Sequence, residues 1–497
     1  MLNALPAKPR STPNMMRIAL ALLALAGSSF AQNGPQAAVR YTLELHSPGE
    51  SALLIHRPEW RLRVQGERLD LDQGPAALVF EHWDDWKALD ALYLDVIDCE
   101  PAVESALHPG NALVVSRPEG WDGSFDVEFR MIPLQAGSRV QQQWARLPSW
   151  TDGYSLGESR SVFPKVYQDR GEIHGTRSVQ LVGPDGQPTA SGWAGLHDPS
   201  QVLAIDPTRG NTFLAFGEPA RERRDLLHGW LEILQYGGPP GVAGPVADLT
   251  ATLASHIGKT LDATPPNPCI VFVHGAGQGG MAADPGLLVG YDRKMPEGYV
   301  HSPYYRHLVA HEFYHQWLGV RVRADESIAW FHEGFTEYLS LWHLVATGLV
   351  EPAWFANRIE ELGKEARDRS TWGEIPFAAP GVQWRDGDGP RETQAYKGGA
   401  MLAFAMDVEL RRRGRSDLSA LVRDLLAAES GPVTLESLEA WARDQGLGTF
   451  WTKHVSGTER LEIAALLATA GFRRSASGER WEALETTAFL KTLPRRE

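Results

Sequence analysis

Two segments in the middle of the chain carry the strongest signal for its fold and chemistry: HEFYH at residues 311–315 and WFHEGFTEY at residues 330–338. His311 and His315 are four residues apart, so on a helix both imidazoles lie on one face and can reach the same ion. Glu312 can turn toward a water on that ion instead of toward the ion itself. This spacing predicts a helix that carries a metal site.

The second segment supplies acidic residues at helical spacing. A catalytic zinc ion has three protein ligands and one open position. Glu333, separated from His315 by seventeen residues, can supply the third ligand from an antiparallel neighbouring helix. Glu337, one turn further on, can accept the outer N–H of a ligand histidine. Burying these acids beside the histidines without a metal ion would cost free energy of folding. We therefore expect one Zn²⁺ per chain, bound by His311, His315 and Glu333.

The order of these two segments resembles that of the gluzincin metallopeptidases, most closely the glycyl aminopeptidase branch, which is related to the aminopeptidase N type. Residues 395–411 are similar to a helix of those enzymes, and residues 450–471 are similar to their C-terminal helical segment. The resemblance covers residues 245–472 well and the preceding part only in outline. It implies a thermolysin-like, mainly α catalytic domain and an aminopeptidase-like zinc peptidase acting on peptides or proteins.

The resemblance also assigns roles to individual residues. Glu312 corresponds to the general base that acts on the zinc-bound water, and Tyr396 to the tyrosine whose hydroxyl stabilises the oxyanion. Gly279, Gly280 and Met281 stand where the family has its substrate-binding edge strand.

The chain departs from the aminopeptidases at one position of that strand. Ala282 stands where they have the glutamate that grips the free amino group of the substrate. Asp284 is the nearest acid, but two residues along a strand move a side chain by several ångströms. A zinc endopeptidase without an amine anchor therefore stays open, as does a catalytically silent zinc protein that only binds peptides.

A serine hydrolase is a further alternative. GYSLG at residues 153–157 fits the nucleophile-elbow pattern, and FVHGAG at residues 272–277 resembles an esterase oxyanion loop. In α/β-hydrolases the oxyanion loop precedes the serine, whereas here it follows Ser155 by more than a hundred residues. The chain order argues against this class.

Four segments are expected, with an α+β multidomain fold. Residues 1–31 are predicted to be a signal peptide, because a basic residue precedes a short apolar run and a small-x-Ala cleavage site. Residues 32–240 alternate apolar and polar positions between turn residues, which predicts a β-rich N-terminal domain. Residues 241–413 form the expected catalytic domain, with helical patterns at 246–262, 304–318, 328–346, 352–369 and 393–413. Residues 414–497 form a small helical C-terminal domain.

Composition limits the remaining possibilities. The 497 residues are 43% hydrophobic and 22% charged, as in globular proteins. A net charge of −14 gives no general attraction to nucleic acid or anionic membranes. The mature chain has no apolar run long enough to span a membrane, so we expect an exported protein, periplasmic or secreted. Whether Cys99 and Cys269 pair, and the oligomeric state, stay open.

Overall fold

The computed structural model describes the chain between residues 37 and 484, with gaps. The described residues are 37–46, 58–69, 76–80, 88–89, 94–100, 103–108, 112–115, 119–136, 138, 147–151, 153–168, 171–173, 176–205, 211–265, 267–276, 279–292, 294–296, 298–379, 389–428 and 431–484. The expected signal peptide, residues 1–31, lies outside them. Among the described helices, none has both the length and the apolar character needed to cross a membrane.

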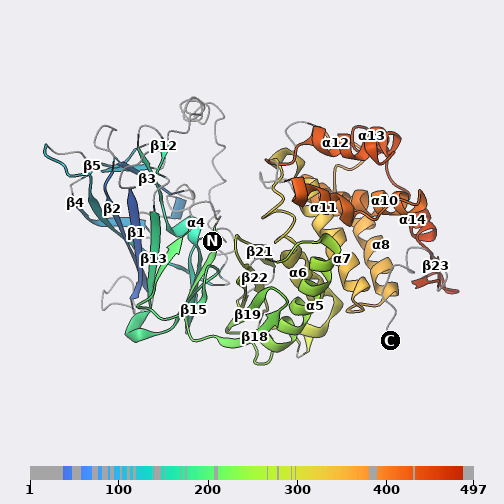
Figure 1. The fold of residues 1–497 in the computed structure, drawn as a ribbon. Coiled ribbons are helices and arrows are strands. Elements are labelled where there is room, and N and C mark those ends of the chain that lie inside the picture. Colours follow the sequence, from blue (N-terminus) through green and yellow to red (C-terminus); the bar gives the residue numbers. More distant parts are fainter. Residues whose placement is uncertain are drawn as a thin grey trace, which may run out of the picture.

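The N-terminal part is built from three sheets, which lie to the left in Figure 1. Their strand orders are β16-β13-β1-β2-β7-β4, β15-β14-β17-β10-β9-β8 and β12-β11-β3-β6-β5. The alternation seen in the sequence explains their faces: in β7, Phe125, Val127 and Phe129 are buried and the residues between them are not. These buried faces share one hydrophobic core, which confirms the β-rich N-terminal region.

The strands of this part have the following bounds: β1 (Ala38–His46), β2 (Glu59–Glu67), β3 (Ala76–Val79), β4 (Leu94–Glu100), β5 (Val103–His108), β6 (Ala112–Val115), β7 (Phe125–Met131), β8 (Leu134–Gln135), β9 (Ser149–Thr151), β10 (Tyr154–Glu158), β11 (Lys165–Gln168), β12 (Gly171–Glu172), β13 (Thr176–Val182), β14 (Thr189–Ser191), β15 (Gly195–His197), β16 (Val202–Ile205) and β17 (Phe213–Gly217). Short helical segments among the described residues of this part include α4 (Ser159–Val162) and η1 (Pro184–Gly186).

A fourth sheet lies between the β-rich part and the helices, in the order β18-β19-β20-β22-β21 (Figure 1). Its strands are β18 (Ala220–Leu226), β19 (Gly229–Tyr236), β20 (Cys269–His274), β21 (Gly280–Ala282) and β22 (Leu287–Gly290). The sheet extends across residue 240, where the sequence predicts a domain boundary, because β19 and β20 pair in parallel. The division of the chain into domains stays a prediction.

Both faces of this sheet are covered, which explains the unbroken apolar sequence of β20. Val271 and Val273 face the core formed with the helices. Ile270 and Phe272 face the β-rich part, where the ring of Phe272 lies 6.0 Å from that of Phe213 in β17. A strand buried on both faces has no polar face to alternate with.

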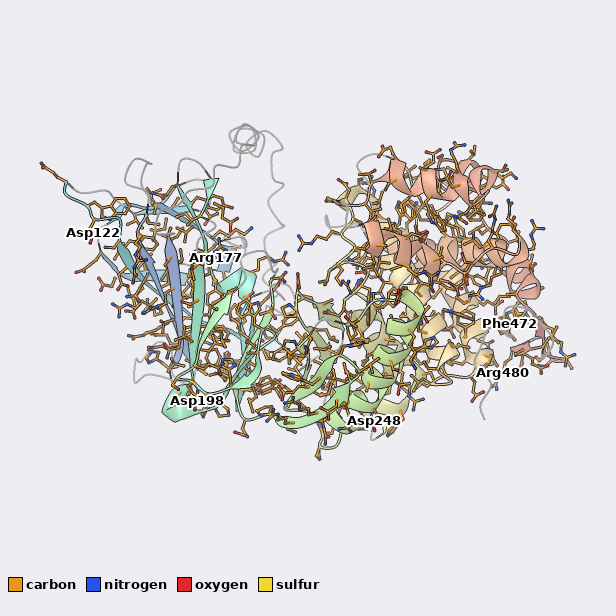
Figure 2. The ribbon with its side chains drawn as sticks, in the orientation of Figure 1. Asp122, Arg177, Asp198, Asp248, Phe472 and Arg480 are labelled. Atoms are coloured by element: carbon orange, nitrogen blue, oxygen red, sulfur yellow. The ribbon has the colours of Figure 1, made fainter. Side chains whose placement is uncertain are left out.

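The C-terminal part is helical, as predicted, and completes the mixed α and β architecture. Its elements are α5 (Ala243–Leu261), η2 (Tyr299–His301), α6 (Pro303–Tyr314), η3 (Glu326–Ile328), η4 (Trp330–Gly334), α7 (Phe335–Ala346), α8 (Pro352–Arg369), α9 (Gly389–Thr393), η6 (Gln394–Gly398), α10 (Gly399–Arg412), α11 (Ser419–Ala428), α12 (Leu435–Asp444), α13 (Gly448–His454), α14 (Ile463–Thr469), β23 (Phe472–Arg474) and β24 (Trp481–Ala483). Figure 2 shows Phe472 and Arg480 at the opposite end of the molecule from Asp122 of the β-rich part. The thermolysin-like detail of this part stays a prediction.

Two helices that the sequence predicts as continuous are interrupted. The helical patterns at residues 328–346 and 393–413 each contain a π-helical turn, η4 and η6 respectively. Such wide turns depend on side-chain packing from neighbouring elements and are frequent at functional sites. Cys99 in β4 and Cys269 in β20 are not joined by a disulfide, which answers the question that the sequence left open.

Candidate metal centre and active site

Three side chains meet in the interior of the helical part: His311 on α6, His315 directly after the end of α6, and Glu333 on η4. His311 Nε2 lies 3.1 Å from His315 Nε2, and Glu333 Oε2 lies 3.5 and 3.3 Å from these two nitrogens. Ligands about 2.1 Å from a tetrahedral zinc ion would be roughly 3.4 Å from one another. The three atoms thus already form a triangle of the size that zinc requires, and each residue is buried.

The outer nitrogen of each histidine has a partner of its own. His311 Nδ1 lies 3.0 Å from Glu337 Oε2, the contact that the sequence predicts for a ligand histidine. His315 Nδ1 lies 3.0 Å from the carbonyl oxygen of Leu318, to which it can donate. With a proton on Nδ1, each ring has its Nε2 lone pair available for a metal ion.

The carbonyl of Leu318 is available because α6 ends early. The sequence predicts a helix as far as residue 318, but α6 ends at Tyr314 and the chain turns after His315. Gly319 has a φ of +129°, which does not occur in a right-handed helix. This turn directs the Leu318 oxygen back toward His315.

Replacing Gly319 even with alanine should impair both stability and zinc binding. A Cβ at this position would overlap His332 Nε2 and lie 3.2 Å from His315 Nδ1. We expect Gly319→Ala to destabilise the protein by about 1–3 kcal/mol and to weaken zinc binding, since His315 must move. Thermal unfolding and the zinc content of the purified protein measure both effects.

Gly414→Ala is the matched control for this prediction. Gly414 also has a positive φ, +67°, but no atom of the described residues lies within 4 Å of an added Cβ. That variant should lose some stability through backbone strain and keep its zinc. Equal zinc binding by the Gly319→Ala and Gly414→Ala variants would contradict the account given for Gly319.

Glu312 lies between this cluster and the edge strand β21. A Cβ on Gly280 would be 2.7 Å from Glu312 Cδ, so only glycine allows the strand to pass so close to the carboxylate. Burial raises the pKa of Glu312 above its usual value, and the charges of His311 and His315 oppose this effect. A carboxylate with a raised pKa is a better proton acceptor near neutral pH.

Tyr396 reaches the same cluster from η6. Its ring stacks on that of His311 at a centroid distance of 6.1 Å. Burial raises its pKa, and so do the charges of Glu333 and Glu312 and a hydrogen bond to Glu333, so the phenol stays protonated and can donate.

A close backbone contact between Gly334 in η4 and Gly399, the first residue of α10 directly after η6, brings η4 and η6 this close together. A Cβ on Gly334 would lie 2.7 Å from the nitrogen of Ala400, and one on Gly399 would lie 3.0 Å from the Cα of Gly334. Any side chain at either position would separate the two π-helical turns. The contact therefore sets the distance between Tyr396 and Glu333.

The sequence interpretation missed two residues of this neighbourhood. His307 is buried, and its Nε2 lies 3.3 Å from the carbonyl oxygen and 3.8 Å from Oε2 of Glu337. Its position four residues before His311 was the available signal. Lys397 follows Tyr396 directly, and its Nζ lies 3.1 Å from Glu337 Oε1. This lysine lies within residues 395–411, which resemble a helix of the gluzincins, and that segment was the available signal.

The remaining residues of β21 lie where the sequence predicts a substrate strand. β21 is the edge strand of its sheet, and Gly280, Met281 and Ala282 pair only with β22 among the described strands. Gly280 and Ala282 share one face of the strand, since side chains alternate. Asp284 lies beyond the strand end, and its Oδ2 is 3.7 Å from Nη2 of Arg323.

The structure excludes Ser155 as a nucleophile. Ser155 is buried as the second of the five residues of β10, and it does not lie at the turn from β10 to α4. Its hydroxyl accepts from Trp60 Nε1 at 3.0 Å and donates to the carbonyl of Ser149 at 2.7 Å. Such a hydroxyl is held in place by structural hydrogen bonds, and the serine-hydrolase alternative is wrong.

Comparison with known proteins agrees with this geometry. Residues 304–383 match the M61 glycyl aminopeptidase family. An aminopeptidase N family protein from Idiomarina loihiensis has a similar structure, with a TM-score of 0.70 at 14% identity, over 87% of this chain and 78% of that one. An M1 zinc metallopeptidase from Deinococcus radiodurans has a TM-score of 0.51 at 17% identity, over 85% and 93% of the two chains.

A variant of the Deinococcus radiodurans enzyme bound to a Tyr-Ser-Ala substrate is also similar, with a TM-score of 0.51 at 15% identity, over 83% of this chain and 90% of that one. A search of curated protein sequences found no match. The similar structures establish that the fold is of the aminopeptidase N type. The region around the candidate metal centre is similar to the M61 glycyl aminopeptidases, and the fold is similar to that of the aminopeptidase N type proteins.

Proposed function

We propose that this protein is a zinc-dependent metallopeptidase that hydrolyses peptide bonds, with aminopeptidase-like activity as the first candidate. The observation that carries the proposal is the preformed triangle of His311 Nε2, His315 Nε2 and Glu333 Oε2, with buried Glu312 beside it. The M61 match and the zinc metallopeptidases among the similar structures support the same activity.

His311, His315 and Glu333 would hold the zinc ion. Burial opposes the charge on Glu333, but His315 and His311 outweigh this effect and keep the pKa of Glu333 well below its usual value. The carboxylate is therefore ionised and ready to bind a cation. When bound, zinc would supply an activated water and polarise the scissile carbonyl.

Two further residues have the remaining roles: Glu312 transfers the proton, and Tyr396 stabilises the negative charge that develops on the carbonyl oxygen. Glu312 accepts the proton of the attacking water and passes it to the departing amine. The Tyr396 hydroxyl, held protonated by its burial and by Glu333, donates a hydrogen bond to the oxygen that becomes negative as the carbonyl is attacked. Neither role requires the residue to be a metal ligand.

The edge of β21 is the proposed place for the substrate backbone. An unpaired strand edge presents N–H and C=O groups to which an extended peptide can bind. Gly280 lies against Glu312, so a peptide aligned with β21 through Gly279, Gly280 and Met281 would pass the general base.

Ala282 favours a second candidate, a zinc endopeptidase. The face of β21 that includes Gly280 is turned toward Glu312, and Ala282 shares that face without offering a carboxylate for a free amino group. Asp284 is paired with Arg323 beyond the strand end. A substrate strand without a carboxylate at position 282 would bind peptides with blocked and with free N-termini equally well.

Matched peptides with free and acetylated N-termini distinguish these candidates. We expect the zinc-loaded protein to cleave peptides, with kcat/KM higher for the free form if it is an aminopeptidase. Similar kcat/KM values for both forms would make it an endopeptidase. Stoichiometric zinc without cleavage of either form would leave a zinc-bearing peptide-binding protein and overturn the proposed activity.

The proposed location is outside the cytoplasm, in the periplasm or secreted, after cleavage behind Ala31. The support is the sequence of residues 1–31, with its basic residue, short apolar run and small-x-Ala site. N-terminal sequencing of the protein from culture fractions tests this: a mature chain that begins at Gln32 is expected.

A further inference from the structure

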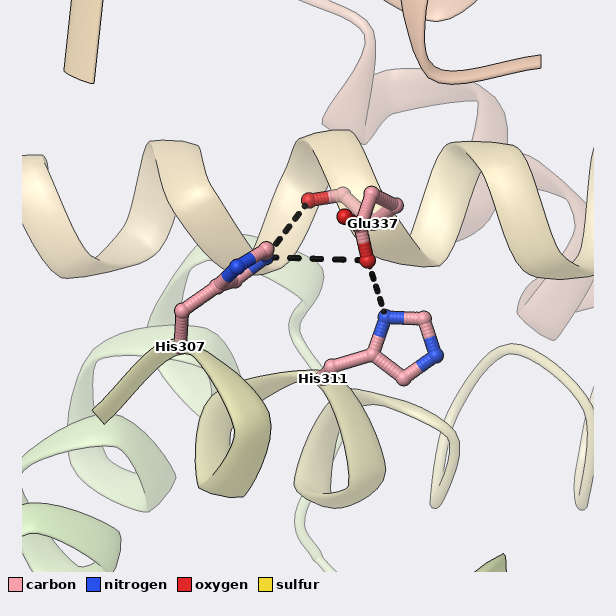
Figure 3. A group of neighbouring side chains, drawn as sticks. All are labelled: His307, His311 and Glu337. Atoms are coloured by element: carbon pink, nitrogen blue, oxygen red, sulfur yellow. Dashed lines mark hydrogen bonds and ion pairs between the residues drawn. The ribbon is translucent and has the colours of Figure 1, made fainter. Parts of the chain in front are cut away.

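The carboxylate of Glu337 is surrounded by charged and polar groups on two sides. On one side its Oε2 faces His311 Nδ1 at 3.0 Å and His307 Nε2 at 3.8 Å (Figure 3). On the other side its Oε1 faces Lys397 Nζ at 3.1 Å and Nη2 of Arg358 at 3.7 Å. Glu337 itself is only 5% exposed, so these contacts are little screened by water.

The group of His307, His311 and Glu337 has the donor atoms of a second metal site, since they lie close enough to share an ion. Lys397 and Arg358 argue against this use. Both carry positive charge and contact the carboxylate that a second cation would need. A divalent ion there would be repelled by two cations in a buried environment, where charges interact strongly.

Lys397 is positioned by the same π-helical turn as Tyr396. The two residues are consecutive in η6, and they reach two acids that lie one helical turn apart on the neighbouring segment. Tyr396 bonds to Glu333, and Lys397 pairs with Glu337. The turn therefore contacts both a proposed metal ligand and the acid that orients another ligand.

We propose that Lys397 is a positioning residue for the metal centre. Its ammonium holds the Glu337 carboxylate against His311 Nδ1, which orients the ring so that Nε2 points at the metal position. From the other oxygen of the carboxylate, the charge of the lysine disfavours a second cation at the His307, His311 and Glu337 group, and the centre binds one zinc ion. The inference rests on the proposed zinc site but adds a residue outside the ligand set.

The test is a double-mutant cycle on zinc affinity, measured by competition with a chelator. Lys397→Met keeps an unbranched apolar side chain, one atom shorter, and removes the charged end. We expect the zinc Kd to rise about tenfold, the lower end of the effect of removing a partner of a ligand histidine, because Lys397 acts one step further away through Glu337. Lys397→Arg should restore most of the affinity. In a Glu337→Gln background, Lys397→Met should change the Kd little further, because its effect acts through Glu337.

Lys453→Met is the matched control, since Lys453 also pairs with a glutamate at 3.1 Å but on the surface. Its zinc Kd and the melting temperature of its metal-free form should equal those of the wild type. The visible spectrum of the Co²⁺-loaded Lys397→Met variant should change, which a purely structural role would not cause.

The outcomes separate this inference from the proposed function. A wild type that binds no zinc would refute the proposed function itself. A wild type that binds one zinc, with an unchanged Kd in the Lys397→Met variant, would refute the role of Lys397 alone. Two zinc ions per wild-type chain would show that the His307, His311 and Glu337 group is a metal site, and would also overturn the inference.

Discussion

Replacing Glu312 with glutamine should lower the rate of peptide hydrolysis by about 10²–10⁴-fold while zinc stays bound. Glutamine has nearly the shape of glutamate but cannot accept a proton at neutral pH. Glu312 is not one of the three residues that form the proposed ligand triangle, so its loss leaves His311, His315 and Glu333 unchanged. The variant should therefore fold normally and be inactive.

Three measurements on the same preparation test this expectation: zinc content, melting temperature and kcat/KM on an unblocked peptide. Glu374→Gln changes an exposed glutamate in the same part of the chain and serves as the control. Full activity in the Glu312→Gln variant would show that another group is the general base. Loss of zinc together with activity would mean that Glu312 maintains the centre itself.

The largest expected effect on stability is at Asp407, in the middle of α10. Its carboxylate is 1% exposed and accepts hydrogen bonds from the hydroxyl of Tyr338, from Arg411 Nε at 3.1 Å and from the backbone nitrogen of Leu418 at 2.8 Å. Through these bonds it joins α7, α10 and the segment before α11. Asp407→Ala should lower the free energy of unfolding by about 3–5 kcal/mol, because it leaves Arg411, whose side chain is only 10% exposed, without its nearest counter-charge.

Urea unfolding followed by circular dichroism measures this loss. Glu439→Ala is the control, since Glu439 pairs with Arg443 on the exposed side of α12 and such a pair contributes at most about 1 kcal/mol. A loss below 1 kcal/mol for Asp407→Ala would mean that the network around Asp407 adds little to stability. The zinc Kd at low temperature should be unchanged, because Asp407 does not contact the proposed ligands.

The helices show how far periodicity alone predicts structure. The pattern at residues 352–369 predicts a helix with the same bounds as α8. The pattern at residues 393–413 indicates helix just as clearly, yet η6 occupies part of it. An apolar period near 3.6 marks the buried face of a helix, but it does not reveal a wide turn produced by a neighbouring backbone.

In the candidate site, too, some features could be predicted from the sequence and others only from the fold. The spacing of His311, His315 and Glu333 predicts a shared ion, because positions one helical turn apart lie on one face. The contact of Lys397 with Glu337 joins residues that are sixty positions apart in the sequence, and no spacing rule relates them. The resemblance to the gluzincins indicated Tyr396 as the residue that stabilises the oxyanion. Only the close approach of Gly334 and Gly399 explains the short distance between Tyr396 and Glu333.

The sequence by itself therefore predicted the β-rich and helical parts, the resemblance to the aminopeptidases and the residues of the proposed metal centre. Only the tertiary structure decided the early end of α6, the two π-helical turns, the burial of Ser155 and the cations around Glu337. The physical reason is the range of the interactions. Local periodicity and motif spacing are properties of neighbouring residues, whereas close backbone contacts and buried charge networks depend on segments that meet only when the chain is folded.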